Sequence, residues 1–182
     1  MMPEISLNIL DVAQNSVTAG ATLTTIKIAA DTKTDKLLTS VTDNGKGMTA
    51  EQVEKVTDPF FTTRTTRKVG LGVPFYKMAA EITGGEFSIE STPGVGTCTT
   101  AIFGLSSIDR MPVGDIATTM ASLVGMNDTI DFVLDYSIDG NGFVMDTREF
   151  RQVLGDISLG EPAVMNYITE YINEGIAACG EL

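Results

Sequence analysis

Two runs of β-branched residues, 22–31 and 36–44, constrain the fold most, because each lies close to a segment with helical spacing. Both runs are rich in threonine, isoleucine and valine, and polar turn residues separate them, so they predict an antiparallel hairpin. Upstream, Ile5, Ile9 and Val12 recur at helical spacing. This pattern predicts a helix over 4–18 that ends at Ala19-Gly20, with Gly20 as a left-handed cap.

The elements that follow, up to residue 104, also have clear signals. Thr49 precedes Gln52 by three positions, which is a capping-box signal for a short helix. Residues 57–69 combine proline, threonines and bases and predict a loop, and residues 71–83 regain helical spacing. Two more strands surround the Pro93-Gly94 turn, over residues 85–91 and 96–103. This order predicts an α+β fold, a two-layer α/β sandwich whose mostly antiparallel sheet carries helices on one face.

Residues 105–182 predict a smaller α/β extension that follows a first domain of residues 1–104. Its expected elements are a helix, a hairpin that turns at DGNG, a short helix and a last helix that opens at Pro162. The extension has 13 acidic and 3 basic residues, whereas residues 1–104 have 11 and 9. An acidic unit repels phosphate backbones and anionic lipids, which argues against nucleic acid and membrane as partners. We expect it to dock to a basic protein surface.

Several function classes are excluded by what the composition lacks. The sequence contains no histidine, so Ser-His-Asp triads, most zinc sites and a phosphohistidine on this chain are ruled out. Cys98 and Cys179 lack CxxC spacing, which favours two reduced thiols over a metal site or a disulfide framework. No basic leader and no apolar run of membrane length is present. We therefore expect a cytoplasmic protein.

The stretch VTDNGKGM, residues 41–48, suggests the base-reading side of a ligand site. Asp43 would end a strand at the edge of a pocket, where its carboxylate can accept a hydrogen bond from an exocyclic amine. Gly45 and Gly47 would let a flat ring approach the main chain, since no Cβ stands in the way. The alternative is an Asn-Gly hairpin turn of the type I′ kind that holds no ligand.

A second glycine-containing stretch, KVGLGVPF at residues 68–75, suggests an anion site. Gly70, Leu71 and Gly72 lie where a loop enters a helix, so free backbone N–H groups would point at a bound anion. The bases Arg64, Arg67 and Lys68 precede them and would reach the same anion. The alternative is an ordinary helix N-terminus behind a solvated basic loop.

Read in order, DVAQNSVTAGAT, DNGKGM, DPFFTT, GLGV and GVGT resemble the motifs of the GHKL superfamily of ATP-binding domains. That superfamily includes type II topoisomerases, heat-shock chaperones, sensor histidine kinases and mismatch-repair ATPases. The resemblance covers residues 4–104 and implies the Bergerat α/β sandwich, in agreement with the element order.

The resemblance also implies roles for single residues. Asn15 would bind the Mg²⁺ that bridges the phosphates of ATP, and Asp43 would read adenine together with Gly47 and a water shared with Thr97. Residues 58–63 resemble the F box, and residues 57–69 would be the mobile ATP lid. The implied nucleotide-binding set is Asn15, Asp43, Gly45, Gly47, Met48, Phe60, Arg64, Lys68, Gly70, Leu71, Gly72 and Thr97.

Asp11 occupies the position where hydrolytic and serine-kinase branches of the superfamily have a glutamate that acts as general base. Aspartate is one methylene shorter than glutamate, so two roles are open for Asp11. It would act as the general base, or it would orient Asn15 or a water bound to magnesium. The resemblance implies an ATP–Mg²⁺-binding, kinase-like regulator of a partner protein. A nucleotide-dependent binding module without phosphotransfer and a slow ATPase are the alternatives.

Overall fold

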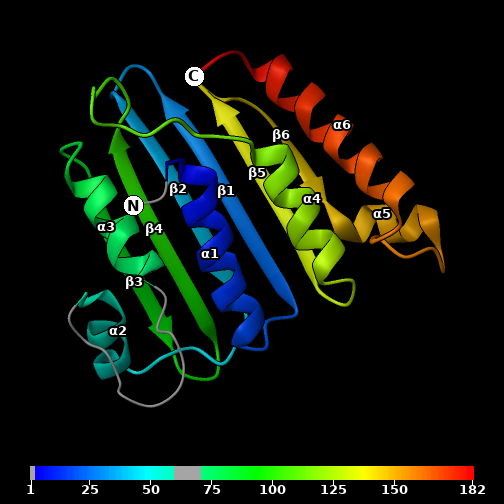
Figure 1. Ribbon diagram of the computed structural model, residues 1–182, viewed down its shortest axis with the longest axis horizontal. Coiled ribbons are helices and arrows are strands. Elements are labelled where there is room, and N and C mark those ends of the chain that lie inside the picture. The colour runs from blue at the N-terminus through cyan, green and yellow to red at the C-terminus, as the bar shows by residue number, and fades with distance from the viewer. Residues whose placement is uncertain (1–2, 60–70) are drawn as a thin grey trace.

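The computed structural model describes residues 3–59 and 71–182, which form a two-layer α+β structure (Figure 1). The strands are β1 (Leu23–Asp31), β2 (Lys36–Asp43), β3 (Glu86–Thr92), β4 (Gly96–Gly104), β5 (Asp131–Ile138) and β6 (Asn141–Asp146). The helices are α1 (Ile5–Thr18), α2 (Ala50–Thr57), α3 (Gly72–Glu81), α4 (Ile116–Met126), α5 (Thr147–Leu154) and α6 (Pro162–Cys179). The α+β class expected from the sequence is confirmed.

All of these strands belong to one mixed sheet, in the order β3-β4-β2-β1-β5-β6. Four of the neighbouring pairs are antiparallel, and β1 and β5 are parallel. Leu23 of β1 lies opposite Asp131 of β5, so the C-terminal hairpin begins at the same end of the sheet as β1. The sheet is therefore mostly antiparallel, as the pattern of short β-branched runs predicted.

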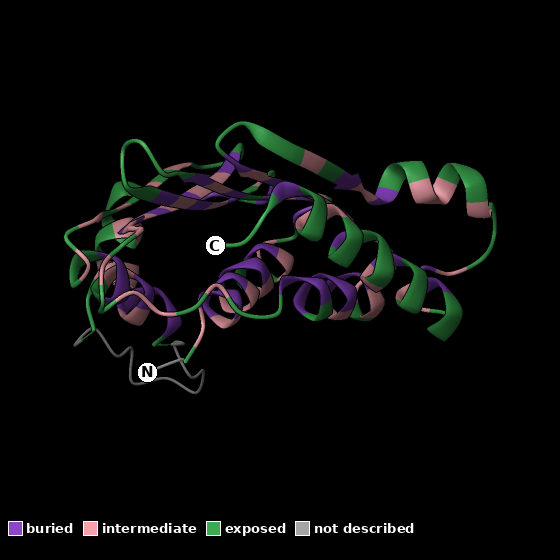
Figure 2. Cartoon of the chain, turned by 90° about the horizontal axis from the view of Figure 1, so that it is seen from above, coloured by how far each residue is buried: buried purple, intermediate pink, exposed green. Residues whose placement is uncertain are grey.

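The helices α3, α1, α4 and α6 pack side by side in that order. They lie on one side of the sheet, and α5 continues beyond the end of β6 (Figure 2). The two layers match the expected sandwich. None of the helices in the described ranges is long and apolar enough to cross a membrane.

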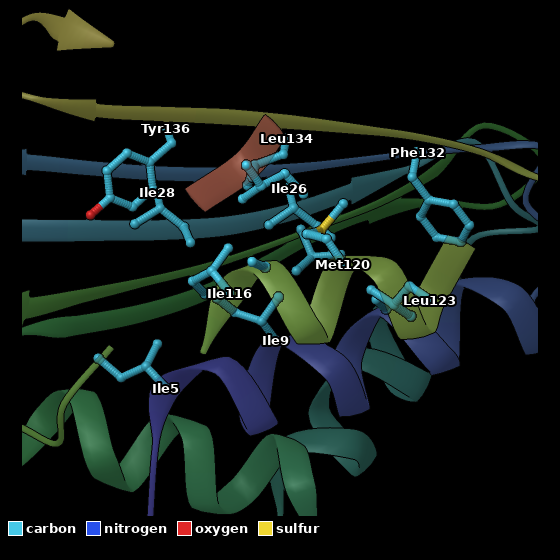
Figure 3. Packing of buried hydrophobic residues seen from close by; sticks show 14 of the residues in the cluster. Ile5, Ile9, Ile26, Ile28, Ile116, Met120, Leu123, Phe132, Leu134 and Tyr136 are labelled. Atoms are coloured by element: carbon cyan, nitrogen blue, oxygen red, sulfur yellow. The ribbon is translucent and has the colours of Figure 1, made fainter. Parts of the chain in front are cut away.

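Between the layers, apolar side chains from both parts of the sequence form one buried cluster. Ile5 and Ile9 of α1 and Met120 of α4 supply the helix side of this cluster, and β1 and β5 supply Ile26 and Leu134 above them (Figure 3). Each of these five side chains is at most 1% exposed. The division into residues 1–104 and 105–182 remains a proposal. Strands from both segments form one sheet, and side chains from both segments form one core.

Several turn and cap signals of the sequence are confirmed. Thr49 accepts a hydrogen bond from the Gln52 amide while the Gln52 side chain accepts one from the Thr49 amide, which is the reciprocal capping box. Gly20 has a φ of 75° just after α1. Asp139 and Gly140 both have positive φ between β5 and β6, as a type I′ hairpin turn requires.

Candidate functional site

The C-terminal end of α1 and the end of β2 lie at the same end of the sheet (Figure 1). A cavity of about 280 Å³ opens there. Gly20 reverses the chain after α1, and the Lys46 amide then donates to the Ala19 carbonyl at 3.0 Å. This bond holds the segment after β2 against the helix end. Among the described residues the cavity is lined by Val12, Asn15, Ser16, Thr18, Ala19, Asp43, Lys46, Gly47, Met48, Val56, Val73, Ile89, Thr97 and Thr99.

The carboxylate of Asp43 has a fixed orientation at the cavity wall. Its Oδ2 accepts a hydrogen bond from the Ser16 hydroxyl at 2.7 Å, and its Oδ1 accepts one from the Gly45 amide at 2.8 Å. A carboxylate has about four lone-pair sites, so two hydrogen bonds leave acceptor capacity for a ligand donor. The side chain is thus positioned before any ligand arrives.

Opposite Asp43, Thr97 borders the cavity and forms a hydrogen bond with the Ser91 hydroxyl behind it. Thr97 of β4 is the register partner of Asp43, and its Oγ1 lies 2.8 Å from the Ser91 Oγ. The Ser91 Oγ also accepts a hydrogen bond from the Met48 amide at 2.8 Å, and its hydroxyl donates one to the Gly96 carbonyl at 3.0 Å. Ser91 therefore ties the segment that carries Met48 to β3 and β4, and Thr97 retains hydrogen-bonding capacity toward the cavity.

Gly47 lies in this segment with a φ of 67°, where L side chains are strained. A Cβ at this position would lie 2.0 Å from the Thr92 carbonyl oxygen, and the neighbouring Lys46 carbonyl accepts the Gly94 amide at 2.7 Å. Glycine is thus required by the close approach of the chain to its own 92–94 turn. The flat-ring argument from the sequence stays a prediction, because chain packing alone already demands glycine at this position.

The type I′ hairpin considered for Asn44-Gly45 is wrong. Asn44 instead anchors the end of β2, because its Oδ1 accepts the Thr22 and Leu23 amides at 2.9 and 3.0 Å. Gly45 is not among the positive-φ glycines, and the chain goes on to α2 rather than to a paired strand. Gly45 is buried behind Asp43, where a Cβ would lie 2.9 Å from the Ala19 Cβ.

The predicted site residues fall into three groups. Asn15, Asp43, Gly47, Met48 and Thr97 surround the cavity. A second group lies beside it without lining it in the described part of the chain: Asp11, Gly45, Leu71 and Gly72. A third group lies outside the described residues: Phe60, Arg64, Arg67, Lys68 and Gly70, together with most of the expected F box and lid.

Asp11 lies against the start of α3, where a Cβ on Gly72 would lie 1.6 Å from the Asp11 Oδ2. Partial burial raises the pKa of Asp11 above its ordinary value of 3.8. Desolvation of this kind is common in groups that transfer protons, and it also occurs in carboxylates that only position a neighbour. The contact makes Gly72 necessary for the Asp11 carboxylate to reach the helix N-terminus.

We expect Asp11→Asn to raise the thermal stability at pH 7, because only the folded ionised carboxylate bears the desolvation cost. Since folding raises the pKa of Asp11, this gain should shrink as the pH falls through the folded-state pKa. It should vanish below the ordinary value of 3.8, where both states are protonated. Thermal unfolding across this pH range measures it, with the exposed loop change Asp109→Asn as a control of equal charge. An unchanged or lower Tm at pH 7 would contradict the expectation.

Several residues in and beside the cavity were not predicted from the sequence. Ser16 continues the apolar stripe of Ile5, Ile9 and Val12 on α1, and a buried hydroxyl in such a stripe signals a polar partner across the core. Lys46 and Ser91 carried no separate signal, since their roles depend on contacts between β2, β3 and the 92–94 turn. The apolar wall comes from Val12, Val56, Val73 and Ile89.

Comparison with known families decides the classification. Residues 3–107, more than half of the chain, match the model of the family described as histidine kinase-, DNA gyrase B- and HSP90-like ATPases. The chain belongs to this family. The GHKL resemblance of the sequence motifs is thereby confirmed, and the matched range agrees with the expected 4–104.

Curated relatives of this GHKL chain include sensor kinases. The sensor protein kinase FleS of Pseudomonas aeruginosa is 36% identical over 97 residues, which is 53% of this chain and 24% of FleS. The sensor histidine kinase ZraS of Klebsiella oxytoca is 44% identical over 57 residues, 31% of this chain and 12% of ZraS. The matched segments thus span at most about a quarter of these two relatives.

Solved structures support the GHKL fold independently. The Aquifex aeolicus MutL ATPase domain complexed with ADP has a TM-score of 0.50 at 13% identity, over 94% of this chain and 70% of that one. The N-terminal domain of a DNA repair protein has a TM-score of 0.54 at 13% identity, over 80% of this chain and 52% of that one. At this identity the likeness concerns the fold alone.

Proposed function

We propose that this protein binds ATP in the cavity at the end of α1 and acts as a kinase-like regulator of a partner protein. The observation that carries the proposal is the Asp43 carboxylate, which two hydrogen bonds hold at the cavity wall with acceptor capacity left over. An adenine amino group is a donor of the kind that this acceptor requires. Family membership and the sensor-kinase relatives support the same assignment.

The residues present also suit Mg²⁺ bound through the nucleotide. Asn15 lies four residues after Asp11 on α1, and it borders the cavity with an exposed side chain. Mg²⁺ prefers oxygen ligands, keeps several waters and takes few protein contacts in phosphate sites, so one carboxamide oxygen is an adequate protein ligand. The metal would supply charge neutralisation at the phosphates. Asn15 would hold it, and Asp11 would orient Asn15 or a bound water.

We expect Asn15→Ala to weaken ATP binding about tenfold in the presence of Mg²⁺, because the protein oxygen that holds the metal is lost. Without Mg²⁺ the same change should have little effect. Calorimetric titration of ATP with and without Mg²⁺ measures both values, and Asn166→Ala, an exposed asparagine on α6, is the matched control. No binding heat from the unmodified protein would overturn the ATP-site assignment.

Phosphotransfer is a separate claim. The sequence contains no histidine, so a phosphorylated histidine would have to belong to a partner, and serine or threonine acceptors are equally suitable. Labelled ATP with candidate partners tests the claim: label on a partner supports a kinase. If ATP binds and no protein is labelled, the kinase role is removed.

The slow ATPase is the alternative, and steady release of phosphate without a labelled protein would favour it. If this ATP turnover survives in Asp11→Asn, Asp11 does not act as the general base.

A second candidate is a nucleotide-dependent binding module without phosphotransfer. A series of hydrogen bonds supports this candidate, because the bonds connect α5 to Asn44, the neighbour of the cavity residue Asp43. Arg151 donates to Asp131 at 2.8 Å, the Asp131 amide donates to the Thr22 carbonyl at 3.0 Å, and the Thr22 amide donates to Asn44 beside Asp43. If ATP and ADP leave both partner affinity and hydrogen exchange of residues 57–69 unchanged, this candidate fails.

The two free cysteines suit a reducing compartment, so we place this function in the cytoplasm.

A further inference from the structure

An apolar groove lies between α5 and α6, outside the part of the chain that matches the ATPase family. Its volume is about 440 Å³. The floor and walls are Phe150, Val153 and Leu154 from α5 and Val164, Tyr167 and Tyr171 from α6. The two helices lie at the far end of the molecule from α2 and α3 (Figure 1).

The aromatic side chains of the groove hold one another in place. The Phe150 ring meets Tyr171 edge-on at 5.6 Å between centroids and Tyr167 at 6.0 Å. The Tyr171 hydroxyl donates to the Val144 carbonyl on the outer strand β6 at 3.2 Å. The groove is therefore a formed feature, and little side-chain ordering remains for a ligand to induce.

Large apolar side chains nevertheless stay open at its walls. Val153 is 87% exposed and Tyr167 is 58% exposed, although both lie beside the buried floor. A contiguous apolar surface with aromatic residues and a polar rim is typical of a protein-binding site.

Acidic residues predominate in the segment that carries the groove, and one of them, Glu149, lines it. From α5 to the end of the chain there are six acidic residues and two arginines. Both arginines are committed to ion pairs, Arg148 with Asp146 at 2.7 Å and Arg151 with Asp131 at 2.8 Å. The acidic residues that are exposed are Glu149, Asp156, Glu161, Glu170, Glu174 and Glu181.

Three of these acidic residues lie on the same helix faces as the apolar residues of the groove. Glu170 lies three residues after Tyr167, and Glu174 three after Tyr171, so they extend the same face of α6. On α5, Glu149 lies four residues before Val153 and itself lines the groove. A ligand with an apolar face would therefore meet carboxylates on both sides.

We propose that the α5–α6 groove binds an amphipathic helix of a partner protein whose apolar face is flanked by lysine or arginine. Such a helix fills a groove with side chains at helical spacing and places its bases against the acidic residues of α5 and α6. A second copy of this chain would bring the same acidic residues against these, and like charges oppose that contact. This inference concerns the docking partner of the regulator and does not depend on ATP binding.

A labelled model helix of leucine and lysine, about 18 residues long, tests the proposal with the full-length chain. We expect Val153→Gln and Tyr167→Ala each to weaken its binding about tenfold, the effect of losing an anchor in a packed groove. Ile108→Gln is the matched control, because Ile108 is also β-branched and is 98% exposed, but lies in the loop before α4. Fluorescence anisotropy measures binding, and circular dichroism checks that the variants are folded.

Charge is tested by Glu170→Gln combined with Glu174→Gln. The double change should weaken binding of the model helix at low salt, and the difference should fade at high salt because exposed charges are screened. A leucine–glutamate helix of the same pattern should bind far more weakly.

Four results would each overturn the proposal: no binding of the leucine–lysine helix, equal binding of a scrambled peptide of the same composition, equal binding of the glutamate helix, or self-association of the protein that Val153→Gln abolishes. ATP titration separates this proposal from the proposed function, because Val153→Gln should bind ATP as the unmodified protein does. If the unmodified protein binds the peptide but not ATP, the groove assignment is intact and only the nucleotide site is removed.

Discussion

Asp43→Asn should weaken ATP binding about 100-fold, the largest effect that we expect from a single side chain. The change replaces one carboxylate oxygen by an NH₂ group, which donates a hydrogen bond where the adenine amino group requires an acceptor. A 100-fold loss corresponds to ~2.7 kcal/mol, within the ~1.5–3 kcal/mol found for hydrogen bonds to charged groups. Calorimetric titration of ATP measures the loss.

The control for this experiment is Asp135→Asn. Asp135 lies on β5, pairs with Lys27 at 3.6 Å and is not among the residues that line the cavity. Asp135→Asn therefore changes the net charge by the same amount as Asp43→Asn without changing the cavity. Its ATP affinity should stay within about twofold of the unmodified protein, as expected for an exposed ion pair. Equal losses for both variants would mean that net charge, and not the Asp43 acceptor, controls nucleotide affinity.

The sequence predicted those features that depend on neighbouring residues along the chain. Helical spacing through Ile5 and Ile9, the Thr49 cap and the hairpin before α5 are local patterns, and each one has its element in the structure. Asp43 and Asn15 were predicted from motifs that follow one another in a recognisable order, and both border the cavity.

Several features that depend on long-range contacts were not predicted. The parallel pairing of β5 with β1 joins residues that are about a hundred positions apart, and no local pattern encodes it. Ser16 has the same explanation: its place on α1 is visible in the sequence, but its bond to Asp43 requires β2 to lie against the helix end. The acidic 105–182 region was read as a docking unit from its charge alone, and only the packing of Phe150 with Tyr167 and Tyr171 reveals a groove there.

Gly47→Ala should produce the largest loss of stability among the changes considered, about 3 kcal/mol, because backbone strain and a steric clash act together. The Ala residue would have to keep a φ of 67°, and its Cβ would lie 2.0 Å from the Thr92 carbonyl oxygen. A loss of this size lowers the Tm of a chain of this length by roughly 6–12 °C. The displaced segment carries Lys46 and Met48, so ATP affinity should also fall about tenfold.

Gly84→Ala separates the two contributions. Gly84 has a similar φ of 77° in the turn before β3, but a Cβ there would have no atom within 4 Å. Its cost should be the backbone strain alone, about 1 kcal/mol, with unchanged ATP affinity. Thermal and denaturant unfolding of the two variants give the difference. If both lose the same stability, the approach of Gly47 to Thr92 adds nothing, and the cavity wall beside Asp43 must owe its position to the Ser91 and Ser16 hydrogen bonds instead.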